Sequence, residues 1–369
     1  MAFKNVIDAA SAADKLARAL EHRLPDVCDV QVTDVEISEA SGMSCETLLF
    51  DAGWSHAGER RRERLVARVQ PTGAGIYPRY DLGLEFSVMQ ALDTHTDIPV
   101  PGMYFHDGAG EFLGTPFIVM RRAEGQAPSD DPPFTTGGWV CELSADRQAT
   151  LHENALSTLA RIHAIDIDAI GLGHLRQHPE SGLDGQLAYW RDTFVWAAPG
   201  EPNPTVEAAL DWVEHNRPDE PGTPVLNWGD ARVGNLMYGD DQSVTAVLDW
   251  EMLTFGPREL DLGWWLSMAR YYTEGIGVPA PPGFPDRDGL IERYQQLTGQ
   301  IVRHLHYYEV FGALRLAILF HRAANLMIDA GQLPPDTSMK ISNPPSHILA
   351  GLLDLPAPVG ESQSFAGNR

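Results

Sequence analysis

The sequence predicts an α+β protein with two lobes: an antiparallel, β-rich N-terminal lobe with one embedded helix, and a larger, mainly helical C-terminal lobe. Two patterns carry this prediction. Apolar residues recur at period two over residues 25–122, which is typical of strands that bury one face. From residue 144 onward they recur at helical spacing, which is typical of amphipathic helices. The length of 369 residues also favours two lobes over a single domain of ~100 to 200 residues.

A helix followed by short strands is predicted for the N-terminal part. Leucines at helical spacing indicate a helix within residues 1–24. Residues 25–122 then form the β-rich lobe, in which one helix is expected from residue 81 to residue 93. The strand-like sets are Val30/Val32, Val35/Ile37, Leu48/Phe50, Leu65/Ala67/Val69 and Phe117/Val119.

A connector and a helical lobe are predicted to follow. Residues 123–143 contain several prolines and glycines, which indicates a turn-rich connector. Residues 144–355 are expected to form the helical lobe, with two short apolar strands at residues 224–227 and 244–249. The tail at residues 356–369 is rich in Pro, Gly and Ser and is predicted to be flexible.

The composition favours a globular cytoplasmic protein. Apolar residues make up 43% of the chain, and the N-terminus lacks the continuous apolar stretch of a secretory signal. No run approaches the ~20 apolar residues that a membrane span needs, so no membrane contact is expected. The three cysteines are odd in number and widely spaced, which fits neither a disulfide framework nor a zinc site.

The net charge bears on the partners of the protein. The formal charge of -24 comes from 51 acidic and 27 basic residues. A surface that follows the phosphates of a nucleic acid is therefore not expected. The charge would attract a cationic substrate, but it also serves solubility alone, and both interpretations stay open.

The strongest functional pattern lies in residues 225–238. An apolar strand ends at a Gly-Asp turn, and Asn235 follows Asp230 by five residues. Asp249 emerges from the end of a second strand, 14 residues after Asn235. Transfer of a phosphoryl group needs a carboxylate beside the incoming hydroxyl, a cation, and oxygen ligands for Mg²⁺. Asp230, Arg232 and Asn235 supply these groups in one tight loop.

With this spacing, the sequence resembles the kinase family that includes aminoglycoside phosphotransferases and choline kinases, whose fold is bilobal and protein-kinase-like. The catalytic loop of that family is similar to His-Gly-Asp-x-x-x-x-Asn, and its metal motif to Ile/Leu-Asp-Trp/Phe-Glu. This chain has Trp228-Gly229-Asp230 with Asn235, and Leu248-Asp249-Trp250-Glu251. The resemblance extends over approximately residues 30–330.

The resemblance implies a role for each matched residue. Asp230 is similar to the catalytic base, and Asn235 and Asp249 are similar to the Mg²⁺ ligands. Trp228 departs from the pattern, because it replaces the usual His and cannot make the same hydrogen bonds. Arg232 stands where protein kinases have a Lys; it binds the transferring phosphate or pairs with a nearby carboxylate, and both alternatives stay open.

The resemblance also implies a nucleotide site in the N-terminal lobe. Arg68 takes the position of the cation for the α- and β-phosphates, and Glu85 that of the carboxylate that orients it. The alternative for Glu85 is a solvated helical side chain. Gly42 and Ser44 belong to a segment that resembles the nucleotide-covering loop, where small residues let backbone amides approach phosphates. An ordinary hairpin turn is the alternative there.

The end of the β-rich lobe is where an adenine would meet the backbone. Met120 and Arg121 are therefore predicted to line the nucleotide site, and packing in the core or at the surface is the alternative. The implied cofactors are Mg²⁺ and ATP, with GTP not excluded.

The acceptor is predicted to be a small hydroxylated molecule. The form Trp-Gly-Asp-Ala-Arg-x-Gly-Asn is most similar to the kinase domains fused to some acyl-CoA dehydrogenases, which indicates a hydroxy-acyl or other small alcohol. An aminoglycoside 3'-type kinase is the second choice among enzymes. A nucleotide-binding pseudokinase or an interaction module without turnover is the alternative from a different class.

Overall fold

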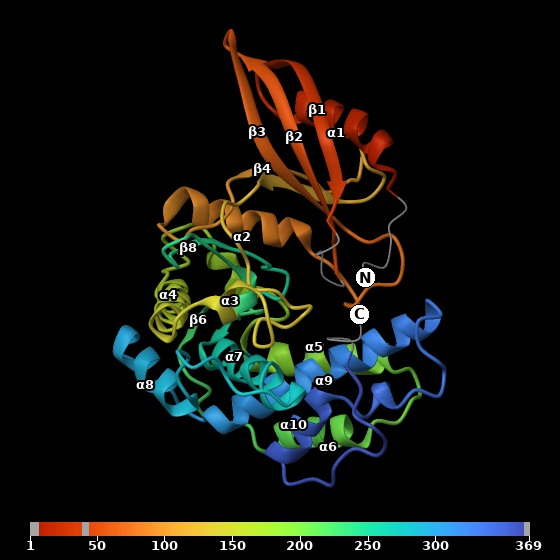
Figure 1. Ribbon diagram of the computed structural model, residues 1–369, viewed down its shortest axis with the longest axis vertical. Helices are drawn as coiled ribbons and strands as arrows, with labels where there is room; N and C mark the ends of the chain where they lie inside the picture. The colour runs from red at the N-terminus through yellow and green to blue at the C-terminus, as the bar shows by residue number, and fades with distance from the viewer. Residues whose placement is uncertain (1–6, 39–43, 365–369) are drawn as a thin grey trace. The chain divides into compact units, whose positions relative to one another are not determined.

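The computed structural model describes residues 7–38 and 44–364 of the chain (Figure 1). The chain divides into two compact units, Met1–Ala123 and Glu124–Arg369. The first unit is built around an antiparallel sheet and the second mainly around helices, as the sequence predicts. The limits given above for the connector and the tail remain predictions.

The first unit contains a five-stranded sheet with the strand order β1-β2-β3-β5-β4, in which all neighbouring strands are antiparallel. β3 therefore lies in the interior of the sheet, between β2 and β5. The strands are β1 (Val27–Ile37), β2 (Glu46–His56), β3 (Glu59–Val69), β4 (Met103–Asp107) and β5 (Phe117–Arg121). The two helices are α1 (Ala9–Arg23) and α2 (Leu82–His95).

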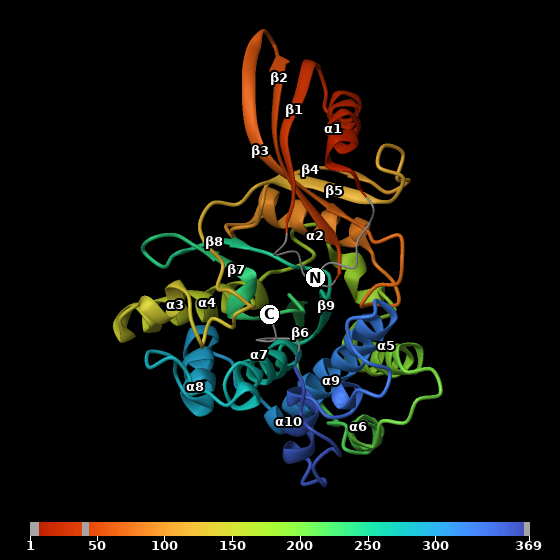
Figure 2. The same ribbon diagram turned by 45° about the vertical axis from the view of Figure 1, so that its right-hand side comes forward.

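Both helices of the first unit pack against this sheet. Leu16 and Leu20 of α1 are fully buried in one cluster with Phe50 of β2, because the apolar face of the helix meets apolar strand residues. Figure 2 shows α1 beside β1. α2 begins at Asp81, whose carboxylate accepts a hydrogen bond from the backbone N–H of Leu84 at 2.8 Å. It packs against β4 and β5, and the helix predicted for this stretch is present.

The second unit is mainly helical, with two small antiparallel strand pairs. The strand pairs are β6 (Pro224–Asn227) with β9 (Thr254–Pro257) and β7 (Leu236–Tyr238) with β8 (Val244–Val247). The helices are α3 (Trp139–Glu142), α4 (Ala145–His163), α5 (Gly182–Ala197), α6 (Pro204–His215), α7 (Glu259–Tyr271), α8 (Arg287–Thr298), α9 (Leu305–Asp329) and α10 (Pro344–Leu352).

Helices α7 and α9 cross at glycines. A Cβ on Gly263 would lie 2.1 Å from the carbonyl oxygen of Tyr308, and a Cβ on Gly312 would lie 2.6 Å from the carbonyl oxygen of Gly263. Because no side chain fits at these distances, the close approach of the two helices requires glycine at both positions. α7 is buried along almost its whole length, and it contributes Asp261 and Trp264 to the loop described below.

Helix α9 differs from the expectation that no segment is apolar enough to span a membrane. By length and composition it is apolar enough to cross a bilayer, with a mean hydropathy of 1.3 over its best window. Within the structure, 78% of that window is buried. A helix that is surrounded by protein is apolar on all sides for the same reason as a membrane helix, so α9 has the character of a core helix.

Candidate active site

The loop after β6 places Asp230 by a sharp backbone turn at Gly229. Gly229 has a φ of 94°, and a Cβ at this position would lie 2.0 Å from the carbonyl oxygen of Met252. Both the left-handed backbone and the close contact exclude a side chain. The glycine that precedes Asp230 in the sequence pattern is thus a conformational requirement of this turn.

The Asp230 carboxylate is held by three donors. Its Oδ1 accepts a hydrogen bond from the Trp264 indole at 2.7 Å. Its Oδ2 accepts from the Asn235 amide at 2.6 Å and from the Arg232 guanidinium at 3.3 Å. Burial raises the pKa of Asp230, and the neighbouring Asp249 also raises it, while the three donors oppose the shift; the pKa stays above its usual range. A raised pKa makes a carboxylate a better proton acceptor near neutral pH.

The backbone of the loop is anchored by Asp261 of α7. Asp261 is fully buried, and its two oxygens accept hydrogen bonds from the backbone N–H groups of Trp228 at 2.7 Å and Gly229 at 2.8 Å. His163 lies 3.0 Å from the same carboxylate and 2.6 Å from the hydroxyl of Tyr294. These hydrogen bonds fix the backbone of the loop to α7. Sequence reasoning missed Asp261, because only the folded chain brings α7 next to this loop.

Trp228 joins the loop to the segment of Asp249. Its side chain is 1% exposed, and its indole N–H donates to the carbonyl oxygen of Leu248 at 2.8 Å. The backbone N–H of Leu248 donates in turn to the carbonyl oxygen of Asn235 at 2.9 Å. The aromatic residue in the place of the usual His therefore has a hydrogen-bond role of its own, and it links the loop to the residue before Asp249.

Asn235 and Asp249 have the chemistry of a Mg²⁺ site. The amide nitrogen of Asn235 donates to Asp230, so its side-chain oxygen is the atom with the chemistry to bind a metal. Asp249 has a φ of 60°, a left-handed conformation that is rare for residues other than glycine and is often found at functional positions. Among the described residues, no group of three or more His, Cys, Asp and Glu is placed to hold a metal. Two oxygen ligands fit Mg²⁺, which takes further ligands from water and phosphates.

Arg232 is engaged by the connector. Its guanidinium binds the two oxygens of Asp130 at 2.7 and 2.9 Å and contacts the hydroxyl of Tyr272 at 3.2 Å. Tyr272 also donates to Asp130 at 2.5 Å. Burial acts to raise the pKa of Asp130, but the charge of Arg232 and these hydrogen bonds outweigh it and hold the pKa below its usual range. Of the two alternatives for Arg232, the pairing with a carboxylate is present in the structure. The sequence did not identify Asp130 as that carboxylate.

In the first unit, Arg68 and Glu85 form the expected pair. Arg68 lies on β3 between Thr47 of β2 and Ile118 of β5. Its guanidinium is 3.0 Å from the Glu85 carboxylate, and the two side chains are 13% and 2% exposed. Glu85 is therefore not a solvated helical side chain, and the pair places a fixed cation on an interior strand.

The other predicted nucleotide contacts have less defined surroundings. Met120 is buried in β5. Arg121 is exposed and lies 3.3 Å from Glu63 on the neighbouring strand. Ser44 is half-buried in a bend just before β2, and Gly42 lies outside the described residues. The roles of these four residues in nucleotide binding stay predictions.

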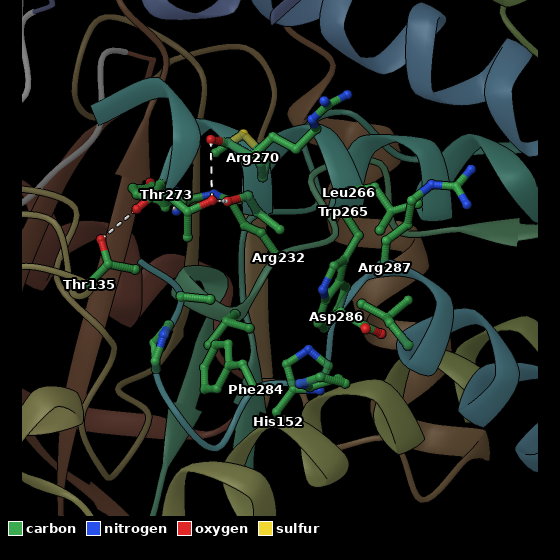
Figure 3. Close-up of a pocket in the computed structure, with 18 of the residues that line it drawn as sticks. Thr135, His152, Arg232, Trp265, Leu266, Arg270, Thr273, Phe284, Asp286 and Arg287 are labelled. Atoms are coloured by element: carbon green, nitrogen blue, oxygen red, sulfur yellow. Dashed lines mark hydrogen bonds between the residues drawn. The ribbon is translucent and has the colours of Figure 1, made fainter. Parts of the chain in front are cut away.

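A cavity of about 530 Å³ lies in the second unit, beside the loop (Figure 3). Arg232 and Val233 contribute to its lining, together with residues of the connector, the segment before α8, and helices α4, α7, α8, α9 and α10. The lining does not include Asp230, Asn235 or Asp249. The cavity thus reaches the loop through Arg232.

A sequence model of the phosphotransferase enzyme family (APH) matches residues 47–299. The chain belongs to this family. It is 28% identical over 247 residues to acyl-CoA dehydrogenase family member 10 of Mus musculus, and 26% identical over 267 residues to acyl-CoA dehydrogenase family member 11 of Rattus norvegicus. These matches cover 66% and 70% of this chain but 22% and 32% of the relatives. The chain therefore spans a third or less of the length of either relative.

Solved structures of phosphotransferases share the fold. A Ralstonia eutropha protein assigned to the aminoglycoside phosphotransferases superposes with a TM-score of 0.66 at 21% identity, over 92% of this chain and 98% of that chain. Plasmodium vivax ethanolamine kinase gives 0.57 at 12%, over 90% and 85%. A thermostable mutant of the aminoglycoside phosphotransferase APH(4)-Ia, in a ternary complex with ADP and hygromycin B, gives 0.54 at 13%, over 93% and 98%.

These comparisons confirm two predictions. The chain is a member of the predicted family, and its fold is the predicted bilobal, protein-kinase-like α+β fold. The family and its structural neighbours also support small-molecule phosphotransfer as the type of activity.

Proposed function

We propose that this phosphotransferase transfers the γ-phosphoryl group of Mg²⁺-bound ATP to the hydroxyl group of a small molecule, with Asp230 as the proton acceptor. The observation that carries the proposal is the surroundings of the Asp230 carboxylate. It is held by Asn235 and Trp264, its pKa is raised, and it neighbours the second acidic residue, Asp249. GTP is the alternative donor.

In this mechanism each residue has one task. Asp230 accepts the proton of the acceptor hydroxyl. At the same time the hydroxyl oxygen bonds to the γ-phosphorus, and the bond between the γ-phosphorus and the leaving nucleoside diphosphate breaks. Arg232, which lies 3.3 Å from Asp230, offsets negative charge on the transferring group. Arg68, fixed by Glu85, binds the α- and β-phosphates. Mg²⁺, when held by Asn235 and Asp249, supplies charge neutralisation at the phosphates.

Two kinds of acceptor are compatible with this site. The relatives of this chain are acyl-CoA dehydrogenase family members, which favours a hydroxy-acyl or other small alcohol. The structural neighbour with bound hygromycin B represents the aminoglycoside alternative. A pseudokinase without turnover is less well supported, because Asp230, Asn235 and the segment of Asp249 are tied together by hydrogen bonds.

The first test is titration calorimetry of ATP and GTP, with and without Mg²⁺, on the wild type, Asp249→Ala and Asp240→Ala. Asp240 is an exposed acidic residue on the nearby turn and serves as the control. We expect Mg²⁺-dependent binding that is lost in Asp249→Ala and kept in Asp240→Ala. Absence of nucleotide binding in all three proteins would refute the donor site.

The second test concerns Asp230. Replacement of Asp230 by Asn should lower phosphoryl transfer by about 10²- to 10⁴-fold and leave nucleotide binding intact, because only the proton acceptor is removed. The measurement is transfer of labelled phosphate to a panel of alcohols that includes ethanolamine and hygromycin B. An Asp230→Asn enzyme with undiminished transfer would contradict the assignment.

A further inference from the structure

The cavity beside the loop has the size of a ligand site. Its volume of about 530 Å³ lies within the range of ~300 to 1,000 Å³ that is usual for sites of small molecules. All of its lining residues belong to the second unit. At one end it reaches Arg232, whose Nε is 3.3 Å from the Asp230 carboxylate. A molecule in the cavity would therefore sit next to the residue proposed to accept the proton.

Aromatic and aliphatic side chains form most of the cavity wall. The principal ones are Phe134, Trp265, Leu266, Tyr272, Phe284 and Leu290. Phe134 packs against Tyr272 and Phe284, with ring centroids 5.1 and 6.2 Å apart. Figure 3 shows Phe284, His152 and Trp265 around the lower part of the cavity. Such a wall favours the binding of an apolar ligand, because binding removes apolar surface from water.

His152 adds to the apolar character of the wall. Its ring lies 4.9 Å from Phe284 and 5.7 Å from Trp265, and its side chain is buried. Burial lowers the pKa of His152 to about 4, so the ring is neutral at physiological pH. The deep part of the wall therefore carries no charge from this residue.

The acidic groups of the lining are already bound. Glu309 accepts two hydrogen bonds from Arg287, at 2.8 and 2.7 Å. Asp286 caps helix α8 and accepts from the backbone N–H of Gly289 at 2.8 Å. The lining contains three guanidinium groups, from Arg232, Arg270 and Arg287, against these two carboxylates. The net charge of -24 of the chain is thus not concentrated in the lining, and a polycation that bound Glu309 would have to displace Arg287.

We propose that this cavity binds the apolar body of the acceptor, with the hydroxyl end of the acceptor at Arg232. The acceptor is then an alcohol with an aliphatic or aromatic body and not a polycationic sugar. The inference rests on the proposed phosphotransfer, whose acceptor class it specifies.

The binding test uses n-butanol, n-hexanol and n-octanol as probes. The dissociation constant is measured by the change in tryptophan fluorescence, because Trp265 lines the cavity. We expect the affinity to rise about fourfold for each added methylene group, as for transfer of a CH₂ group out of water. Hygromycin B should not compete with n-octanol. Equal affinity along the series, or displacement of n-octanol by hygromycin B, would overturn the proposal.

Two variants locate the binding. Ala269 lies in the lining and is exposed on α7, so Ala269→Trp fills the cavity without disturbing the core. Ala330 is an exposed alanine at the end of α9 that does not line the cavity, and Ala330→Trp is the control. Ala269→Trp should weaken n-octanol binding by about tenfold or more, whereas Ala330→Trp should not. Equal weakening in both variants, or in neither, would contradict the location.

The turnover test separates this inference from the proposed function. With ATP and Mg²⁺, the wild type should phosphorylate n-octanol with a lower KM than n-butanol. Ala269→Trp should raise the KM for n-octanol and leave the affinity for ATP unchanged. Chain-length-dependent binding without phosphorylation of any alcohol would support the cavity as an apolar site and contradict the phosphotransfer. Phosphorylation of aminoglycosides alone would support phosphotransfer and contradict the acceptor class.

Discussion

The Asp230 carboxylate combines two opposing influences. Burial and Asp249 raise its pKa, whereas Arg232, Trp264 and Asn235 stabilise the charged form. A carboxylate without these donors would be protonated when buried, and one without burial would be a weak proton acceptor. The donors therefore oppose protonation of the buried carboxylate, and they also fix its direction.

Removal of one donor should shift the pH dependence of the reaction. Trp264→Phe deletes the indole N–H that donates to Asp230 Oδ1 at 2.7 Å. The pKa of Asp230 should rise further, because the hydrogen bond stabilises the ionised form. Since Asp230 must be ionised to accept a proton, the acid limb of the kcat/KM profile should move to higher pH.

The control for this shift is Trp190→Phe. The Trp190 indole donates to Gln186 and not to Asp230, so the acid limb should stay at the wild-type position. The measurement is the pH profile of kcat/KM for both variants at saturating Mg²⁺. A Trp264→Phe profile that coincides with the wild type would show that Asp230 is not the group that titrates.

At the scale of the elements, the sequence predicts local relations well. Asp230 and Asn235 lie between β6 and β7, and Asp249 follows β8, so all three fall within a short stretch of chain and their spacing was enough to group them. The anchor Asp261 is separated from Trp228 by 33 residues, and Asp130 is separated from Arg232 by 102. Nothing in the local pattern assigns these partners, because an Asp at a helix start or in a turn is common for other reasons.

The hydrogen bond of Trp228 gives a test of this segment. Trp228→Phe keeps the aromatic ring but leaves the buried carbonyl oxygen of Leu248 without its indole donor. The free energy of unfolding should fall by about 1 to 3 kcal/mol. Because Leu248 precedes Asp249, the Mg²⁺-dependent affinity for ATP should fall as well. Urea unfolding and titration calorimetry measure the two effects.

The matching control again uses Trp190→Phe, which removes an indole hydrogen bond elsewhere in the unit. It should lower stability without changing the Mg²⁺-dependent affinity for ATP. If both variants bind ATP equally well, Trp228 supports only the fold and not the position of Asp249.

The crossing of α7 and α9 gives a second test at this scale. A Cβ on Gly312 would lie 2.6 Å from both the carbonyl oxygen of Gly263 and the hydroxyl of Ser267. Gly312→Ala should therefore lower the free energy of unfolding by about 1 to 3 kcal/mol, the usual cost of overpacking. Gly351→Ala on α10 is the control, because no atom lies within 4 Å of its added Cβ.

The two glycine variants should differ in sign. In Gly351→Ala the higher helix propensity of alanine should raise stability by up to about 1 kcal/mol. Chemical denaturation of both variants measures the difference. Unchanged stability in Gly312→Ala would show that the two helices separate at no cost, contrary to the close packing of α7.

At the scale of the whole molecule, composition predicted less than the motifs did. The charge of -24 left open whether a cationic substrate is attracted. The cavity beside Arg232 shows why total charge does not decide this: Glu309 is paired with Arg287, Asp286 caps α8, and the wall is mainly apolar. The α+β class followed from periodicity, whereas the cavity depends on side chains of seven separate segments and has no signature in the sequence.

Burial of His152 should make the stability of the protein depend on pH. Burial lowers the pKa of His152 from 6.5 to about 4, and Glu153 opposes this only partly. Between these pH values the unfolded chain binds a proton at this residue that the folded chain does not bind. Stability should therefore be complete above pH 6.5 and should be lost progressively as the pH falls towards 4, by about 3 kcal/mol in total.

The contribution of His152 is isolated by comparison of variants. His152→Phe keeps a ring in the aromatic wall but cannot be protonated, so its free energy of unfolding should fall less than that of the wild type between pH 6.5 and pH 4. His174 is exposed, and His174→Phe should follow the wild type. Parallel curves for all three proteins would mean that His152 takes up its proton in the folded state, and the cavity wall would then be charged at mildly acidic pH. A steeper wild-type curve would show that the folded protein needs His152 in its neutral form, and hence that the uncharged cavity wall contributes to stability.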